Sequence, residues 1–366
     1  MLQARQLGKE LVVGVHSDEE ILHNKGPVVM KLDERLAAVN ACKWVTETVG
    51  DAPYVTEPEF MAKYGCKYVV HGDDITTDAN GEDCYKGVKE KGMFVVVKRT
   101  PDISTTDLVA RMLLVTKSHH FPSIDDTKSA SDHVLFQDGR FDRFKSYATD
   151  VTGHKANAGV YAYCAKGSEP GLHTIVEPSE GNKANFNSGN NIYIDGAFDL
   201  FHAGHIAALR LMREEADKTG SSVFVGLHDD DTVNEAKGKH HPIMSIYERA
   251  LCVLSCRYVD AIIIGAPHKP TVSFLKNLPG GKTGNADKDT LPVVKVFHGP
   301  TPVDHGLYDE VPHIFHQLPD HRYSHVTTDT IVNRVMGNRK AYEERQARKG
   351  WKSETEKKLK AAELGV

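Results

Sequence analysis

Two histidines separated by two small residues, His202 and His205, occur in the stretch IDGAFDLFHAGHIAALR at positions 194–210. Imidazole groups can donate hydrogen bonds to phosphate oxygens, whose negative charge grows when a phosphoryl group is transferred. The preceding NIYI is typical of a strand and HIAALRLMREEADK of a helix, so His205 is expected at a helix N-terminus, where anions bind. Gly204 has no Cβ, which would let a ligand approach the backbone. The pattern predicts a phosphate-binding site between a strand and a helix.

A second group of residues with phosphate chemistry is RTPDISTT at positions 99–106, between the predicted strand MFVVVK and the predicted helix DLVARMLLV. The planar guanidinium of Arg99 can bind phosphate oxygens with two parallel hydrogen bonds. The hydroxyl groups of Ser104, Thr105 and Thr106 either cap the following helix or hold a triphosphate at its N-terminus. The sequence alone leaves both interpretations open.

The chain contains an internal repeat, in which segments of the two halves match in the same order. The matching pairs are VVGVHSDEEILHNKG (12–26) with FVGLHDDDTVNEAKG (224–238), ERLAAVNACKWV (34–45) with ERALCVLSCRYV (248–259), YVVHG (68–72) with VKVFHG (294–299), and RTPDISTTDLVARM (99–112) with RYSHVTTDTIVNRV (322–335). The matched positions include Lys, His and Arg, which are poor packing residues. We therefore interpret the repeat as the duplication of a site and not of a scaffold alone.

Both halves alternate short apolar runs, such as ELVVGV and SVFVGL, with segments of helical apolar spacing. This alternation favours an α/β fold with a parallel, doubly wound, Rossmann-like sheet in each half. Ligands of such sheets bind at the carboxyl ends of the strands. Four histidines follow strands at that edge, namely His16, His71, His228 and His298.

The pattern divides the chain of 366 residues into four parts. We expect a first α/β domain at 1–118, an irregular linker rich in Ser, Asp, Gly, Asn and Lys at 119–190, a second α/β domain at 191–338, and a charged helix at 339–366. The linker and the charged helix match neither copy of the repeat.

The composition excludes several classes of protein. A formal net charge of −5 argues against a general nucleic-acid binder. The apolar runs are too short to span a bilayer, and the first residues have no apolar signal segment. The six cysteines form no CxxC pair, so we expect reduced thiols in a cytoplasmic protein. Cys252 and Cys256 lie four apart on a predicted helix, where we expect them to pack and not to bind a metal.

Together, DGAFDLFHAGH and RTPDISTTDLVARM resemble the cytidylyltransferase family, Rossmann-like nucleotidyltransferases with an HxGH motif and an RTxGISTT-type signature. The resemblance covers nearly the whole chain, except the linker, the segment around 275–293 and the tail. The tandem arrangement is similar to the branch of the family that acts on phosphoethanolamine. It implies that CTP and phosphoethanolamine react to CDP-ethanolamine and pyrophosphate, with Mg²⁺ on the triphosphate and without a covalent enzyme intermediate. A homodimer is a further expectation.

The resemblance also implies roles for individual residues. In the second copy, Ala197 and Phe198 would border the nucleotide, His202, His205 and Lys237 would hold its phosphates, His298, Gly299 and Thr301 would line the strand edge, and Thr327 and Thr328 would close the site. In the first copy, the matching positions are Lys25, Arg35, His71, Gly72, Asp73, Arg99, Thr100, Ser104, Thr105 and Thr106. Of all these, His202, His205, Lys25 and Arg99 would be catalytic.

The two copies depart from the family pattern in different ways. Alignment of VVGVH with FVGLH places the first copy's opening strand and HxGH before Met1, so we expect a chain that is truncated at its N-terminus. In the second copy Tyr323 replaces the threonine after Arg322, and in the first Asp102 stands where glycine is usual. We therefore expect impaired catalysis, and a non-catalytic, cytidine-nucleotide-binding regulatory subunit is the alternative function.

Overall fold

The computed structural model describes residues 1–74, 76–98, 100, 105–114, 116–126, 130–166, 169–238, 241–280 and 291–344. The chain divides into two compact units. The first unit comprises Met1–Asn40, Trp44–Leu113 and Asp329–Val366, and the second comprises Ala41–Lys43 and Leu114–Thr328. No described helix combines the length and the apolarity that crossing a membrane requires.

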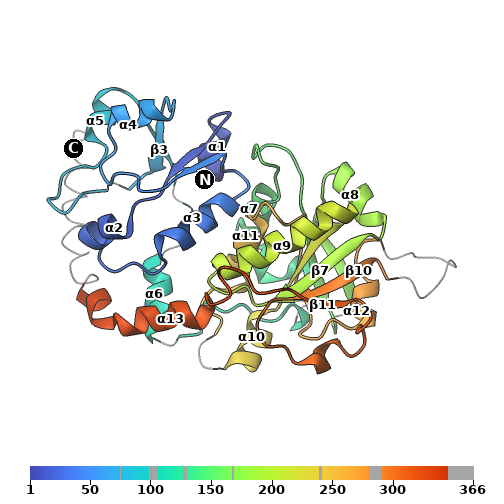
Figure 1. Ribbon diagram of the computed structural model, residues 1–366. Helices are drawn as coiled ribbons and strands as arrows, with labels where there is room; N and C mark the ends of the chain where they lie inside the picture. The colour runs from blue at the N-terminus through green and yellow to red at the C-terminus, as the bar shows by residue number, and fades with distance from the viewer. Residues whose placement is uncertain are drawn as a thin grey trace. The chain divides into compact units, whose positions relative to one another are not determined.

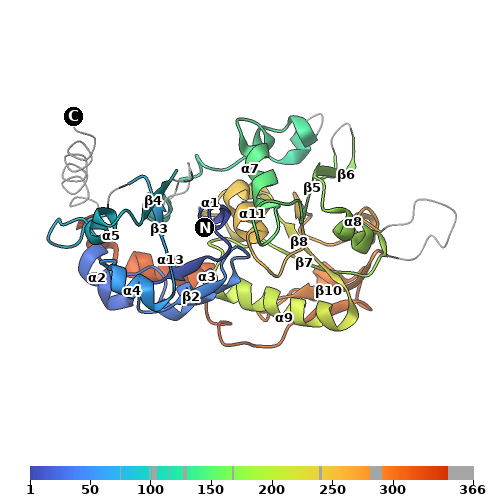
Figure 2. The same cartoon turned by 90° about the horizontal axis from the view of Figure 1, so that it is seen from above.

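The second unit is built on one seven-stranded sheet (Figure 1). Its strands are β5 (Gly159–Cys164), β6 (Gly171–Val176), β7 (Asn191–Gly196), β8 (Ser222–Leu227), β9 (Ala261–Ile264), β10 (Val293–His298) and β11 (Phe315–Gln317). They lie in the order β11-β10-β7-β8-β9-β5-β6, and every pairing is parallel except that of β5 with β6. Central β7 and β8 are seen between β10 and β5 in Figure 2. The predicted parallel sheet is confirmed.

Helices connect these strands and cover the sheet. They are α7 (Arg140–Tyr147), α8 (Glu180–Asn187), α9 (Ala203–Thr219), α10 (Asp230–Lys237), α11 (Ile246–Leu254) and α12 (Val272–Lys276). Helix α9 packs on β8, and α11 packs on β8 and β9. Side chains alternate between the two faces of a strand. The face of the sheet that α9 and α11 do not cover therefore presents its own set of buried residues.

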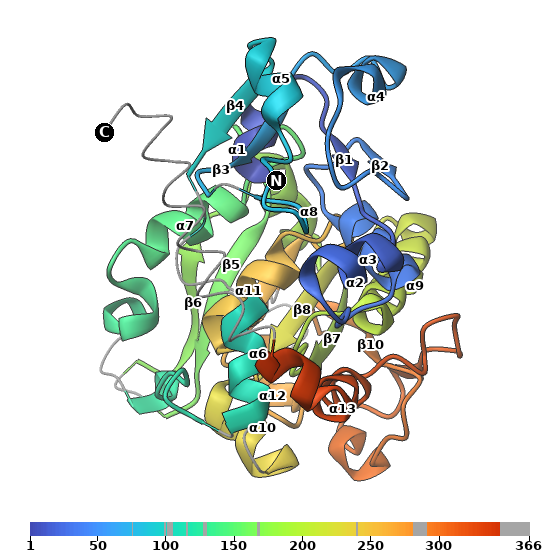
Figure 3. The ribbon, with the colours of Figure 1, turned by 90° about the vertical axis from the view of Figure 1, so that its left-hand side faces the viewer.

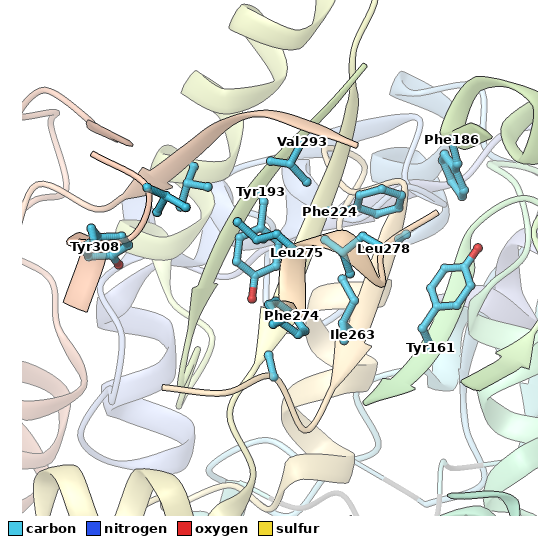
Figure 4. Close-up of a cluster of buried hydrophobic side chains, with 14 residues drawn as sticks. Tyr161, Phe186, Tyr193, Phe224, Ile263, Phe274, Leu275, Leu278, Val293 and Tyr308 are labelled. Carbon is cyan, nitrogen blue, oxygen red and sulfur yellow. The ribbon is translucent and has the colours of Figure 1, made fainter. Parts of the chain in front are cut away.

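That other set forms an aromatic-rich core. Tyr193 of β7 and Phe274 of α12 have ring centroids 5.6 Å apart, and Phe186 of α8 and Phe224 of β8 have centroids 4.9 Å apart. Figure 4 shows Tyr193 above Phe274, and Phe224 between Tyr193 and Phe186. Their burial anchors β7, and with it the turn that leads to His202.

The segment 119–190 is not the irregular linker that its composition suggests. It contains three short 3₁₀ turns (Ile124–Asp126, Ala130–Asp132 and Val134–Phe136), α7, β5, β6 and α8. Strand β5 extends the sheet beside β9, and β6 forms its outer edge. The expectation of irregularity was wrong because two short strands within a polar segment gain their structure from pairing with the sheet. The division into domains at residues 118, 190 and 338 stays a prediction.

The first unit repeats part of this design. Its elements are α1 (Leu2–Gln6), β1 (Val12–Gly14), α2 (Asp18–Lys25), α3 (Leu32–Ala41), β2 (Glu47–Val49), α4 (Pro58–Lys63), β3 (Val69–Gly72), α5 (Lys86–Glu90), β4 (Phe94–Val97), α6 (Thr105–Leu114) and, from the end of the chain, α13 (Thr328–Gly337). Residues 339–344 are helical, whereas the rest of the expected charged helix, 345–366, lies outside the described residues.

The strands of the first unit form two separate parallel pairs, β1 with β2 and β3 with β4 (Figure 3). By the repeat, β1 corresponds to β8 and β3 corresponds to β10. In the second unit, β7 lies between β8 and β10 and pairs with both. No strand among the described residues joins β1 to β3. Strand β1 is only partly buried, while β8 is buried throughout. The expected truncation stays a prediction.

Candidate nucleotide site

The HAGH sequence forms the start of helix α9, with His202 as the N-cap residue. The backbone N–H of Gly204 donates to Nδ1 of His202 at 3.1 Å, and the backbone N–H of His202 donates to Nδ1 of His205 at 3.4 Å. The side chains of His202 and His205 thus accept hydrogen bonds from two backbone N–H groups at the start of the helix. The two rings stack, with centroids 3.8 Å apart and planes 25° apart.

These caps determine the tautomers of both imidazoles. A ring nitrogen that accepts a hydrogen bond carries no proton, so a neutral imidazole with an accepting Nδ1 has its proton on Nε2. Both His202 and His205 therefore present an Nε2–H donor when neutral. Desolvation by burial lowers the pKa of His205 well below its usual value, and the neighbouring His202 and Lys237 lower it further. His205 is accordingly neutral at physiological pH.

The turn between β7 and α9 is strained and held from several sides. Phe198 and Leu200 adopt positive φ values of 49° and 52°, which cost energy in residues with a side chain. The ring of Phe198 lies 5.1 Å from that of His205. Thr328, which belongs to the same unit as this turn, donates from Oγ1 to Asp199 O at 3.1 Å.

Gly204 serves this closure and not the predicted approach of a ligand. A Cβ added at Gly204 would lie 2.4 Å from the carbonyl oxygen of Val326. The space beside the glycine is therefore occupied by the chain just before Thr327 and Thr328. The prediction about Gly204 was wrong because a distant loop, invisible in the local sequence, packs against it.

Two buried carboxylates, Asp199 and Asp230, orient the loops around HAGH. Asp199 accepts hydrogen bonds from the backbone N–H groups of Ile243 and Met244 at 2.8 and 2.9 Å, and its Oδ2 lies 3.6 Å from Nδ1 of His241. Burial alone would raise the pKa of Asp199, but the nearby His241 and the hydrogen bonds from the backbone outweigh burial and lower the pKa. This carboxylate remains ionised and has a structural role.

Arg249 of α11 is a fully buried cation that joins four segments. It donates to Met244 O at 3.1 Å, Ala197 O at 2.6 Å, His228 O at 2.8 Å and Asp230 Oδ1 at 2.8 Å. The bond to Ala197 fixes the first residue of the turn before HAGH.

In the first unit, Arg35 occupies the corresponding place. It donates to Met30 O at 3.0 Å, His16 O at 2.7 Å and Asp18 Oδ1 at 2.5 Å. The family resemblance placed Arg35 among the ligand-binding residues. Its contacts are those of a residue that holds loops together.

A third buried carboxylate, Asp195, lies at the end of β7 without a partner for one oxygen. Its Oδ2 and the Nε2 of His228 have no hydrogen-bond partner, and Oδ1 lies 4.0 Å from that Nε2. Burial raises the pKa of Asp195 to about 7 and lowers that of His228 to about 3. The positive charge of Lys237 also lowers the pKa values of both His228 and His205.

His298 ends β10, and its Nδ1 lies 2.9 Å from Gly299 O. Its ring is 6.0 Å from that of Tyr308, and burial and the carboxyl group of Asp195 raise the pKa of that phenol. A Cβ added at Gly299 would meet no atom within 4 Å, so the space beside it is open. Thr301 lies in an exposed loop, where its carbonyl accepts a hydrogen bond from Gln317.

The first unit shows part of the same arrangement. Nζ of Lys25 lies 5.5 Å from the ring centroid of Tyr54, and Lys25 lowers the pKa of His16, although burial lowers it more. His71 Nδ1 lies 3.2 Å from Gly72 O, as in the second copy. Helix α6 begins at Thr105.

The remaining predicted residues of the first unit are exposed or half-buried, or they lie outside the described residues. Asp73 and Thr105 are exposed, and Thr100 and Thr106 are half-buried. Arg99 and Ser104 lie outside the described residues.

Sequence reasoning missed four residues of the second unit: Asp195, Asp199, Asp230 and Arg249. A signal for two of them was available, because Asp18 and Arg35 repeat as Asp230 and Arg249. Asp195 and Asp199 lie within the DGAFDLFHAGH stretch itself, where their burial could not be deduced from spacing.

Comparison with known proteins matches the chain to one family of transferases. Residues 1–111 and 193–281 match the cytidylyltransferase-like family model. The chain is 38% identical over 354 residues to the ethanolamine-phosphate cytidylyltransferase of Dictyostelium discoideum, covering 95% of this chain and 88% of the relative. The mouse protein of that name is 39% identical over 363 residues, covering 95% and 84%. Human choline-phosphate cytidylyltransferase A is 42% identical over only 116 residues, 31% of each chain.

Proposed function

The chain belongs to the ethanolamine-phosphate cytidylyltransferase family, and on that premise we propose that it makes CDP-ethanolamine and pyrophosphate from CTP and phosphoethanolamine. In this reaction a phosphate oxygen of phosphoethanolamine attacks the α-phosphorus of CTP. The bond from that phosphorus to the bridging oxygen breaks, and pyrophosphate leaves. No covalent bond to the protein is needed, so the protein's part is to position the groups and stabilise charge.

The observation that carries the proposal is the pair of stacked imidazoles at the start of α9. Both are fixed by backbone N–H groups in the tautomer that presents Nε2–H. Such donors suit phosphate oxygens whose charge grows in the transition state, and the helix N-terminus adds a favourable dipole. Lys237, which interacts with His205, supplies a full positive charge beside them. We assign these three residues to the triphosphate of CTP.

Asp195 is suited to the ammonium group of phosphoethanolamine. It is a buried carboxylate with an oxygen that accepts no hydrogen bond, and a cation is the partner that such a group requires. Its raised pKa of about 7 has burial as its main cause, and an ammonium nearby would lower that pKa and restore the charge. The phenols of Tyr193 and Tyr308 interact with this carboxylate.

Magnesium enters this proposal as part of the substrate, bound to the triphosphate oxygens of CTP. The described residues include no cluster of three or more carboxylate, imidazole or thiol groups that could hold a metal ion. We assign no step to a protein-bound metal. The six cysteines form no CxxC pair, which favours a reducing, cytoplasmic setting. A homodimer stays a prediction.

The test combines turnover with binding. We expect the wild-type chain to form CDP-ethanolamine and to bind CTP in calorimetry. His202→Asn keeps a side chain that can cap α9 but removes the Nε2–H donor, and should lower turnover about 10²-fold or more. The matched control is His154→Asn in an exposed loop, which should change neither quantity.

The alternative role, a regulatory subunit that binds cytidine nucleotides, makes a different prediction. It requires CTP binding by the wild-type chain without product formation at any substrate concentration. That result would reject the transferase proposal. Undiminished CTP binding by His202→Asn would reject the assignment of the site.

A further inference from the structure

Cys42 and Cys256 occupy the same position in the two copies of the repeat, within ERLAAVNACKWV and ERALCVLSCRYV. The two residues are partners in an isolated antiparallel bridge. Ala41–Lys43 groups with the second unit, so both sides of the bridge belong to that unit. This pair has no part in the proposed reaction.

The hydrogen bonds around the bridge determine its type. The N–H of Lys43 donates to Ser255 O at 2.9 Å, and the N–H of Arg257 donates to Ala41 O at 2.8 Å. These bonds flank the cysteines and do not join them to each other. Cys42 and Cys256 are therefore a non-hydrogen-bonded antiparallel pair, the type in which facing side chains are closest.

This backbone geometry matches the requirement of a disulfide bond. Facing residues of a non-hydrogen-bonded pair have Cα atoms about 4.5 Å apart, and disulfides span Cα separations of about 4.4–6.8 Å. Both cysteines are buried, with 7% and 1% of their surface exposed. The chain has already placed the two thiols together in a reduced protein.

The surroundings make the pair slow to react. Burial raises the pKa of Cys256 to about 12, although Lys43 and Arg257 oppose the rise. The thiolate is the reacting species, so the reaction requires transient opening of the bridge. Cys252, one turn earlier on α11, is half-buried and also interacts with Cys42. Cys252 competes with Cys256 for a disulfide bond to Cys42, so a test must distinguish the two products.

We propose that Cys42 and Cys256 form a reversible disulfide bond by exchange with a low-molecular-weight disulfide, such as oxidised glutathione. One cysteine thiolate attacks a sulfur of the small disulfide and releases one small thiolate. The second cysteine thiolate then attacks the protein sulfur of the mixed disulfide and releases the other. Two cysteine thiols are oxidised, one small disulfide is reduced to two thiols, and the two cysteine protons pass to the small thiolates through solvent.

The bond would link residues 42 and 256 and so constrain the unfolded chain over more than half of its length. It would join two positions of the second unit, neither of which belongs to the proposed site. We therefore expect oxidation to raise the thermal midpoint of the second unit by several degrees, reversibly.

The test is to incubate the purified chain at pH 8.5 with oxidised glutathione, and separately with diamide, for a day. Remaining thiols are then blocked under denaturing conditions and the protein is digested without reductant. We expect four blockable thiols in place of six, one cross-linked peptide pair containing Cys42 and Cys256, and recovery of all six after dithiothreitol. Six remaining thiols under both oxidants, or a cross-link from Cys42 to Cys252, would overturn the proposal.

Variants provide the controls. Cys42→Ser and Cys256→Ser should each abolish the cross-linked peptide and the oxidation-dependent rise of the thermal midpoint. Cys252→Ser and Cys66→Ser should retain both. Loss of the cross-link in Cys252→Ser, with circular dichroism unchanged, would also reject the assignment.

Discussion

Arg35 and Arg249 make the same three kinds of contact in the two units of the chain. Each donates from Nε to a methionine carbonyl five residues earlier, to the carbonyl of a histidine that follows a strand, and to an aspartate two residues after that histidine. Arg249 makes a fourth bond, to Ala197 O in the turn before HAGH. The arginine thus couples the strand ends to the turn that positions the imidazoles.

Replacing Arg249 by methionine should therefore be far more damaging than the same change at Arg35. The side chains of Arg249 and Asp230 are fully buried, so the variant leaves an uncompensated carboxylate and should lose about 3–5 kcal/mol of unfolding free energy. The side chains of Arg35 and Asp18 are 19% and 34% exposed, and water can replace the lost partner, at a cost of about 1 kcal/mol. Urea denaturation followed by circular dichroism measures both. Equal losses would contradict this account.

The repeat made much of the fold predictable. The offsets between the copies identify which segments share a structure, and the strand, turn and helix around HAGH were expected at the residues where they occur. The assignment of β5 and β6 failed because GVYAYC and GLHTIV lie in a polar segment and become strands by pairing with the sheet.

The candidate site was predictable only in part. Local spacing identified His202 and His205, because their chemistry and their helix lie within a few residues. It could not reveal that Val326 fills the space beside Gly204, or that Arg249 is buried. Those facts depend on contacts between segments that are far apart in the sequence.

Gly204 and Gly299 should differ in how much stability the same substitution costs. Gly204→Ala forces Val326 away from the turn, since the new Cβ would lie 2.4 Å from its carbonyl oxygen, and should cost about 2 kcal/mol or more of stability together with CTP affinity. Gly299→Ala meets no protein atom within 4 Å and should leave the thermal midpoint unchanged. If Gly299 lines the nucleotide site, its variant still binds CTP more weakly. Thermal denaturation and calorimetry separate the two effects, and a fully tolerated Gly204→Ala would contradict the packing described.

His202 has two roles that two variants can separate. Both His202→Ala and His202→Asn remove the Nε2–H donor, but asparagine can still accept the hydrogen bond from the Gly204 N–H. We expect His202→Ala to lose about 1 kcal/mol of stability relative to His202→Asn, while both variants bind CTP equally poorly. Unfolding free energies and calorimetric titrations test this. Equal stability of the two variants would show that the cap contributes little.

Asp195 and His228 should oppose each other in the dependence of stability on pH. Folding lowers the pKa of His228 from 6.5 to about 3, so acidification below pH 6.5 protonates the unfolded chain first and lowers stability. Folding raises the pKa of Asp195 from 3.8 to about 7, so acidification from pH 7 protonates the folded chain first and increases stability. Each slope is at most about 1.4 kcal/mol per pH unit. Asp195→Asn removes only the second effect, so its unfolding free energy should fall more steeply than that of the wild type between pH 6.5 and 4.5. Urea titrations at several pH values measure this difference, and Asp217→Asn, at an exposed position, is the control. Parallel curves of unfolding free energy against pH for Asp195→Asn and the wild type would contradict the burial of this carboxyl in its neutral form.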